Sequence, residues 1–330
     1  MKKTQKMVAV AATAFGLLFG MSCRKTPTES VSTPTSTSSA WTKSALFSSL
    51  RTAPFKFSVD AGVPSVGYGP QGTKLVFYAN SFKDGTGNVI SSGKIDIELI
   101  EMYTPGSMIA NNAVTTCNGQ LLRSGGQVKI TVTQNGKEVY ANRYGIGFKQ
   151  PEASSNPMEL FYSDNNSFDS TTVWGQPDTM RNVLDRMVLQ TMADTTSKPG
   201  LPPSITHYYM FDSCTRFRWV NCDFFYYNPA PRTNIYVQLS DTSFNYINSA
   251  VFLVIVSERA VASTSYQWSA KRFVGINFPE GQSMKLVFMG KIGDSHFYAE
   301  KIFEVSREIK LQLTPLKVSS AEIKTKLASF

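Results

Sequence analysis

Apolar and polar side chains alternate strictly at several places in this 330-residue chain. In Lys94–Leu99, three aliphatic side chains fall on one face of an extended segment and three charged side chains fall on the other. Gln127–Thr133 repeats this pattern and is followed by Asn135-Gly136 and then by Glu138–Ala141. Strict alternation is typical of a half-buried strand, and Asn-Gly supplies the two positive-φ residues of a type I′ turn. The sequence therefore predicts a β-hairpin here.

Further short apolar or aromatic runs, separated by turn residues, continue along most of the chain. Aromatic residues make up 12% of it, which favours strands. Their spacing of roughly ten residues is typical of β-sandwiches. We therefore predict an all-β protein with two β-sandwich-like domains. The remaining strand candidates are residues 75–79, 207–211, 216–227, 235–239, 250–256, 273–276, 285–289, 297–303 and 310–313.

Two segments depart from the strand pattern. Asp178–Ala193 carries apolar residues at helical spacing and precedes a Pro-rich stretch, so it predicts a short connecting helix and a linker over 176–203. Ser319 and Glu322 have the spacing of a capping box, which predicts a last short helix through Leu327. The expected domains are then 46–175 and 204–330.

The N-terminus has the pattern of a bacterial secretory signal. Three lysines precede an apolar run, Met7–Met21, which is too short for a comfortable membrane span. Ser22-Cys23 follows and resembles the lipobox of bacterial lipoproteins, although Gly20 stands where that motif usually has Leu. The resemblance implies a signal peptide over 1–22 and diacylation (palmitate-type lipid) on Cys23. The alternative is an ordinary secreted protein cut by the general signal peptidase.

The segment after Cys23 is rich in Ser, Thr and Pro as far as Ser39, so residues 23–45 are expected to form a flexible tether. Without the three lysines of the signal, 30 basic residues face 24 acidic ones, an excess too dilute to indicate nucleic-acid binding. We expect an outer-membrane lipoprotein of a bacterial cell envelope, facing either the periplasm or the medium.

Familiar catalytic motifs do not occur in the chain. It has no His-Glu-x-x-His, Gly-x-Ser-x-Gly, Walker or Cys-x-x-Cys sequence, and its two histidines, His207 and His296, lie in strand patterns. We predict no catalytic residues, no cofactor and no metal. Asp164–Asp169 could hold calcium, but it lacks the Gly and the terminal Glu of an EF-hand loop and is expected to be an Asx-rich turn. Cys117, Cys214 and Cys222 are expected to be buried free thiols, although a bridge between the last two remains an alternative.

Aromatic residues crowd into the segment from Tyr208 to Tyr227. Phe217 and Trp219 alternate with arginines, which predicts that both face the core from one side of a strand. Tyr208, Tyr226 and Tyr227 are the best candidates for an exposed surface that binds a ligand or a partner.

The segment Trp219–Phe225 resembles the Trp-Ile-Asn-Cys-Asp-Arg-Phe element of uncharacterised envelope lipoproteins from Bacteroidetes-type bacteria, with Phe224 in place of the usual Arg. The first half, including Ser124-Gly125-Gly126, is similar to the N-terminal part of the same group. The resemblance spans most of residues 50–305. It implies an envelope location and an all-β fold, and it implies no catalytic residue.

These features predict a lipid-anchored envelope protein that acts as a non-catalytic binding or structural module, with a membrane, an envelope protein or a glycan as partner. The alternative is an outer-membrane accessory protein that binds glycans or assists carbohydrate processing.

Overall fold

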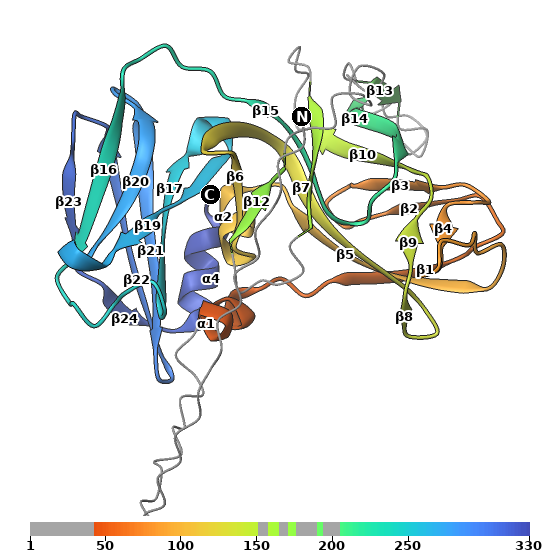
Figure 1. Ribbon diagram of the computed structural model, residues 1–330, viewed down its shortest axis with the longest axis horizontal. Coiled ribbons are helices and arrows are strands. Elements are labelled where there is room, and N and C mark those ends of the chain that lie inside the picture. Colours follow the sequence, from red (N-terminus) through yellow and green to blue (C-terminus); the bar gives the residue numbers. More distant parts are fainter. Residues whose placement is uncertain (1–42, 151–157, 165–170, 176–189, 194–204) are drawn as a thin grey trace, which may run out of the picture. The chain divides into compact units, whose positions relative to one another are not determined.

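The computed structural model describes residues 43–150, 158–164, 171–175, 190–193 and 205–330. Strands dominate these residues, and the prediction of an all-β protein is confirmed. Residues 39–330 form one compact unit. Figure 1 shows the two groups of sheets that make it up.

The first sandwich consists of two sheets that face one another across a shared core. In the first sheet the main order is β1-β5-β7-β15-β11, with β6, β8 and β12 attached at its margins, and in the second it is β13-β14-β10-β3-β2. Inward side chains of β5, β7 and β15 pack against those of β3, β10 and β14. The bounds are β1 Phe55–Asp60, β2 Ser65–Tyr68, β3 Lys74–Phe77, β5 Lys94–Met102, β6 Ala113–Cys117, β7 Gln120–Gln134, β8 Lys137–Glu138, β10 Tyr144–Gln150, β11 Glu159–Ser163, β12 Thr172–Trp174, β13 Gln190–Ala193, β14 Ile205–Cys214 and β15 Arg218–Phe225. A separate small pair joins β4 Phe82–Lys83 to β9 Tyr140–Ala141.

The predicted hairpin is confirmed in detail. Asn135 and Gly136 have φ angles of 51° and 75°, as a type I′ turn requires. The turn pairs Gln134 with Lys137 and so joins β7 to β8. On β5, the aliphatic face predicted from alternation is buried at Ile95, Ile97 and Leu99, each at most 1% exposed.

The second sandwich lies in the C-terminal part of the chain. Its sheets have the orders β19-β20-β16-β23 and β18-β17-β21-β22-β24. Aliphatic and aromatic side chains from both sheets form a second core. The bounds are β16 Arg232–Leu239, β17 Ser249–Ile255, β18 Ala260–Ser263, β19 Ser265–Gln267, β20 Arg272–Pro279, β21 Ser283–Ile292, β22 Ser295–Glu304, β23 Lys310–Leu313 and β24 Leu316–Val318, with single 3-10 turns at η1 Val256–Glu258 and η2 Trp268–Ala270.

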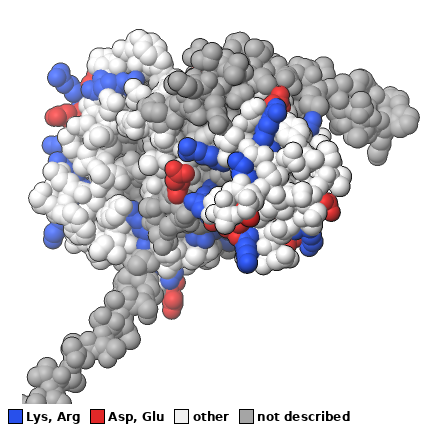
Figure 2. Space-filling view, turned by 45° about the vertical axis from the view of Figure 1, so that its right-hand side comes forward, with Lys and Arg blue, Asp and Glu red and all other residues white. Residues whose placement is uncertain are grey.

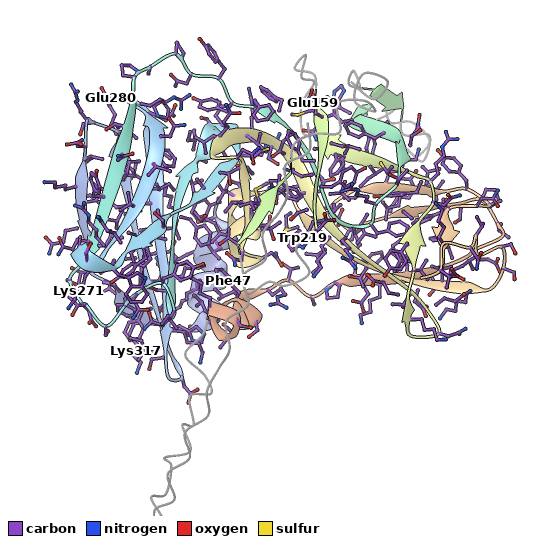
Figure 3. The ribbon with its side chains drawn as sticks, viewed as in Figure 1. Phe47, Glu159, Trp219, Lys271, Glu280 and Lys317 are labelled. Carbon is purple, nitrogen blue, oxygen red and sulfur yellow. The ribbon has the colours of Figure 1, made fainter. Side chains whose placement is uncertain are left out.

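A third core joins the two sandwiches. It combines apolar side chains from β17, β18 and β21 of the second sandwich with side chains from β5, β6 and β15 of the first. Three helices contribute to it: α1 (Lys43–Leu50), α2 (Pro105–Ala110) and α4 (Ser320–Ala328). Phe47 of α1 meets Phe252 of β17 edge to face, with ring centroids 6.2 Å apart (Figure 3). The sandwiches therefore share buried surface.

The C-terminal helix is confirmed, and two helices were not predicted. Ser319 accepts a hydrogen bond from the Glu322 amide, and Glu322 accepts one from the Ser319 amide, which is the predicted capping box. The helix α1 begins at Lys43, inside the segment expected to be a tether. The helix α2 begins after Thr104, which caps it, and this helix was not among the predicted elements.

The first sandwich contains strands from both sides of the domain boundary expected at residue 204. Both β14 and β15 follow that boundary in the sequence, yet they pair with β10 and β7 of the N-terminal part. Pairing partners that lie far apart in the sequence leave no local signal, so this arrangement was not visible in the pattern.

Several other predictions concern segments of which the structure describes only a part. Of the expected helix over Asp178–Ala193, residues 176–189 lie outside the described part, and Gln190–Ala193 is a strand that pairs with β14. Residues 165–169 of the Asp164–Asp169 loop also lie outside it. Cys117, Cys214 and Cys222 are buried and free, as expected.

Candidate functional site

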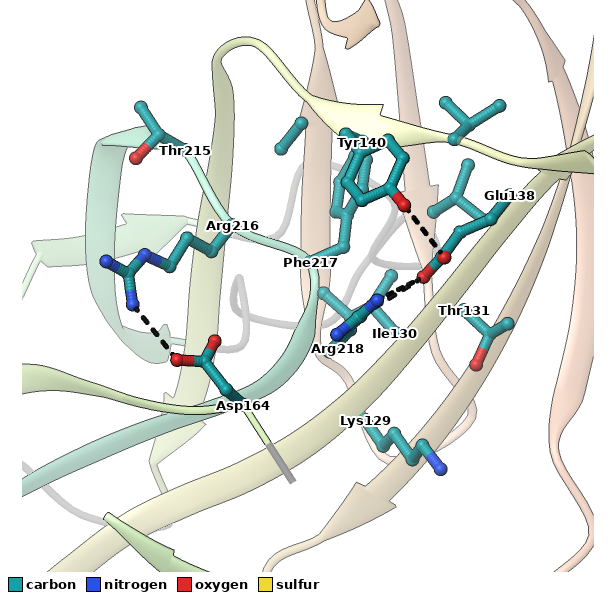
Figure 4. A pocket seen from close by; sticks show the side chains of 13 residues that line it. Lys129, Ile130, Thr131, Glu138, Tyr140, Asp164, Thr215, Arg216, Phe217 and Arg218 are labelled. Atoms are coloured by element: carbon teal, nitrogen blue, oxygen red, sulfur yellow. Dashed lines mark hydrogen bonds and ion pairs between the residues drawn. The ribbon is translucent and has the colours of Figure 1, made fainter. Parts of the chain in front are cut away.

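An open pocket of about 520 Å³ lies at one end of the first sandwich. Four separate segments form its walls: the β7 strand, the β8–β9 region, the end of β11 and the connection from β14 to β15 (Figure 4). We call it the arginine pocket. Its lining residues are Lys129, Ile130, Thr131, Val132, Glu138, Val139, Tyr140, Ala141, Asp164, Thr215, Arg216, Phe217 and Arg218.

The connection from β14 to β15 is held in place at Phe217. This ring is 7% exposed and lies 4.8 Å from the Tyr144 ring, centroid to centroid. The Tyr144 hydroxyl donates a hydrogen bond of 2.8 Å to the carbonyl oxygen of Arg216. Because the loop is anchored at this residue, the two flanking arginines, Arg216 and Arg218, are positioned at the pocket.

Arg218 is fixed by Glu138 of β8. Its Nη2 and Nε atoms donate to Glu138 Oε1 at 2.8 and 3.1 Å. The Tyr140 hydroxyl donates to the other oxygen of Glu138 at 3.0 Å. These hydrogen bonds, that of Arg218 first, hold the pKa of Glu138 below its usual value. Glu138 is therefore a carboxylate that organises the pocket wall.

Arg216 is held more loosely, by the face of the Tyr162 ring 5.7 Å away and by one long ion pair. Its nearest carboxylate is Asp164, with Nη1 and Oδ2 3.9 Å apart, and the two side chains are 59% and 86% exposed. That separation exceeds a hydrogen bond, and exposed pairs of this kind add little stability. Figure 4 shows Arg216 extending toward Asp164 and away from Arg218. Its guanidinium can thus be redirected to a ligand at small cost.

Lys129 adds a third positive charge. Its pKa falls to about 8, chiefly through burial, with the nearby charges of Arg51 and Arg218 adding to the shift and that of Glu98 opposing it. Its ammonium group lies 5.3 Å from the centre of the Trp219 ring. The pocket lining thus holds three basic and two acidic side chains, one positive charge in excess. On the face shown in Figure 2, basic and acidic side chains lie next to one another.

A second polar cluster lies buried where the first sandwich meets the second. Asn221 donates to Asp223 Oδ2 at 2.5 Å, and Arg259 donates to Gln150 at 3.2 Å. Burial raises the pKa of Asp223 to about 8, although Ser124, Asn221 and the charge of Arg259 oppose the shift. This cluster is enclosed, so we regard it as part of the junction between the sandwiches. No group of three or more His, Cys, Asp or Glu in the described ranges is placed to hold a metal ion.

The predicted tyrosines occupy different environments. Tyr208 is 8% exposed on β14, opposite Lys149 of β10, whereas Tyr227 is 83% exposed. Tyr226 is partly buried, and its hydroxyl donates to Gln282 of the second sandwich at 2.8 Å. The structure does not bring the three rings together on one exposed face. Cys23 lies outside the described residues, and its lipidation stays a prediction.

Phe217 and Trp219 are both buried, as expected, at 7% and 0% exposure. The expectation that they share one face of a strand is wrong, because Phe217 packs in the core of the first sandwich and Trp219 in the core that joins the sandwiches. The cause is Arg218, whose φ of 72° is left-handed and interrupts the extended alternation. His296 of β22 meets α1, with its Nε2 2.9 Å from Ser49 Oγ.

Sequence reasoning did not find the arginine pocket. Arg216 and Arg218 were noted as the polar partners of Phe217 and Trp219, and Glu138 as part of a hairpin. No local pattern connects them, because about 80 residues separate Glu138 from Arg218. Among the described helices, none is long and apolar enough to cross a membrane. A scan against models of protein families and a search of curated proteins find no match to this chain.

Proposed function

We propose that this chain is a lipid-anchored protein of the bacterial cell envelope that acts as a non-catalytic binding module, with the arginine pocket as its ligand site. The observation that carries the proposal is the lining of the pocket. Two arginines and a lysine surround aromatic and aliphatic side chains in a hollow of about 520 Å³. Concave sites of this size with a few converging polar groups are typical of small-ligand binding.

The anchor is supported by the sequence. Ser22-Cys23 follows an apolar signal, and a Ser/Thr/Pro-rich segment follows the cysteine. Acyl chains on Cys23 would hold the protein at the outer membrane, because each buried CH₂ contributes about 0.8 kcal/mol and more than one chain gives stable attachment. The tether would let the pocket sample the space near the membrane, on the periplasmic or the outer side.

A glycan is the ligand class that this lining favours over an envelope protein. Tyr140 is 42% exposed at the pocket, where its ring can lie against a sugar face. Thr131 is exposed beside it and offers a hydroxyl for hydrogen bonding. An accessory role in capturing glycans is therefore the more specific form of the proposal.

The test is retention of the purified chain, beginning at Ser39, on envelope polysaccharide isolated from membranes and coupled to a resin. We expect the unmodified chain to be retained and Arg216→Glu to elute in the void, because the substitution reverses a charge at the pocket. Arg307→Glu is the matched control, since Arg307 is also exposed but lies in the second sandwich. Equal retention of all three proteins would contradict the assignment of the pocket.

A further inference from the structure

We infer that the arginine pocket binds an acidic sugar, one that carries a carboxylate on its ring. This inference rests on the proposed function and names the ligand class of the same site. It follows from the charge excess, from the donors that the arginines have left to offer, and from the mixed polar and apolar walls.

Both arginines have N–H donors left for a ligand. Arg218 uses Nε and Nη2 on a single oxygen of Glu138, and its Nη1 donates to no described residue. Arg216 meets its carboxylate only at 3.9 Å and is 59% exposed. Guanidinium groups bind carboxylates through paired N–H donors, which makes these hydrogen bonds stronger than those between neutral groups. A ligand carboxylate at this place would gain donors that the protein does not already use.

The electrostatics point the same way. Lys129 is partly buried and lies near the positive charges of Arg51 and Arg218, and its pKa falls to about 8. A negative group brought into the pocket would favour its charged form. Binding of an anion and protonation of Lys129 are therefore coupled, and each strengthens the other.

The two carboxylates of the lining limit the charge of the ligand. The three basic residues exceed Glu138 and Asp164 by one positive charge. A monoanion matches that excess, whereas a phosphate dianion brings a second negative charge that the lining does not balance and that both carboxylates repel. A ligand carboxylate is thus better suited to the pocket than a phosphate group.

The remaining walls suit a sugar ring. Tyr140 supplies the apolar wall, with 42% of its surface exposed, whereas Val132 and Val139 of the lining are 2% and 4% exposed. The carboxylate of Glu138 can accept from a sugar hydroxyl in addition to its present donors. A pyranose has apolar faces and a polar edge, so it can use both kinds of wall. A small inorganic anion would use only the donors.

The experiment is calorimetric titration of the chain from Ser39 with galacturonate, a sugar with one carboxylate, and with its methyl ester, which has the same ring without the charge. We expect the ester to bind at least about tenfold more weakly, since a charge-assisted hydrogen bond contributes that much. Arg216→Ala should weaken binding of galacturonate by a similar factor, and Arg307→Ala should leave it unchanged. In the same titration followed by NMR, the pKa of Lys129 should rise from about 8 when galacturonate is bound.

Several results would overturn the inference. If the ester binds as well as the acid and Arg216→Ala weakens neither, the pocket does not recognise a carboxylate. If inorganic phosphate or a peptide with a free C-terminal carboxylate binds as tightly as galacturonate and competes with it, the ligand class is wrong. If no probe binds, the inference fails as well, and retention on envelope polysaccharide then decides separately whether the pocket is a ligand site at all.

Discussion

Replacement of Asp223 by Asn should change how the stability of this protein depends on pH. The carboxyl group is fully buried, and burial raises its pKa to about 8 from an ordinary value of 3.8. Its Oδ1 atom is buried and receives no hydrogen bond from any described residue. A charged carboxylate oxygen is costly to bury without a donor, so this environment favours the protonated form.

The sign of the effect follows from proton binding. Between about pH 4 and about pH 8, the folded chain keeps a proton on Asp223 that the unfolded chain has lost. The free energy of unfolding therefore falls as the pH rises through this range, by up to 1.36 kcal/mol per unit. The contribution is complete below about pH 4 and lost above about pH 8. Over the whole shift it reaches roughly 5–6 kcal/mol as an upper bound.

Asparagine keeps the size of the side chain, can accept from Asn221 and does not titrate. The difference in unfolding free energy between Asp223→Asn and the unmodified chain should thus grow by up to about 1.4 kcal/mol per unit from about pH 5 to about pH 8. Urea unfolding followed by tryptophan fluorescence measures it, because Trp174 and Trp219 are buried. Taking the difference removes the contribution of every other titrating group.

Asp294→Asn is the control, because Asp294 is fully exposed and its 3.8 Å ion pair with Lys291 adds little stability, so this substitution should change the unfolding free energy little. If the Asp223→Asn difference were also flat, the carboxyl would be ionised in the folded protein. The reasoning from burial and from the unpartnered Oδ1 atom would then be wrong.

Cys23→Ala should move the protein from the membrane fraction to the soluble fraction, and unchanged fractionation would contradict lipidation. Trp219→Ala should cost about 3–5 kcal/mol in urea unfolding, because the ring is fully buried and its removal leaves a cavity. Trp268→Ala, at 58% exposure, should cost far less, and equal losses would show that burial does not set the cost. Tyr226→Phe should lower the unfolding free energy by about 1 kcal/mol through loss of the hydrogen bond to Gln282, whereas Tyr227→Ala should leave the melting temperature nearly unchanged.

The sequence by itself determined the local structure wherever neighbouring residues carry the information. Alternation on β5 assigned its inner face correctly, since successive side chains of a strand point to opposite sides. Asn135-Gly136 determined the hairpin, and Ser319 with Glu322 determined the start of α4. In each case the stabilising contacts lie within a few residues of one another.

The tertiary structure decided which faces meet. Lys43–Leu50 is a helix with a buried face because it packs on β17 and β21, outside the reach of any local pattern. The left-handed Arg218 sends Phe217 and Trp219 into different cores, although their spacing in the sequence suggested a common face.

The candidate site was decided in the same way. Lys129, Glu138, Asp164 and Arg216 come from separate strands and loops, and strand pairing over long sequence distances brings them to one pocket. Exposure follows the same rule: Tyr208 is covered and Tyr227 is open, although both belong to one aromatic-rich segment. Burial depends on which sheets stack and which loops cross them, and that is a property of the whole fold.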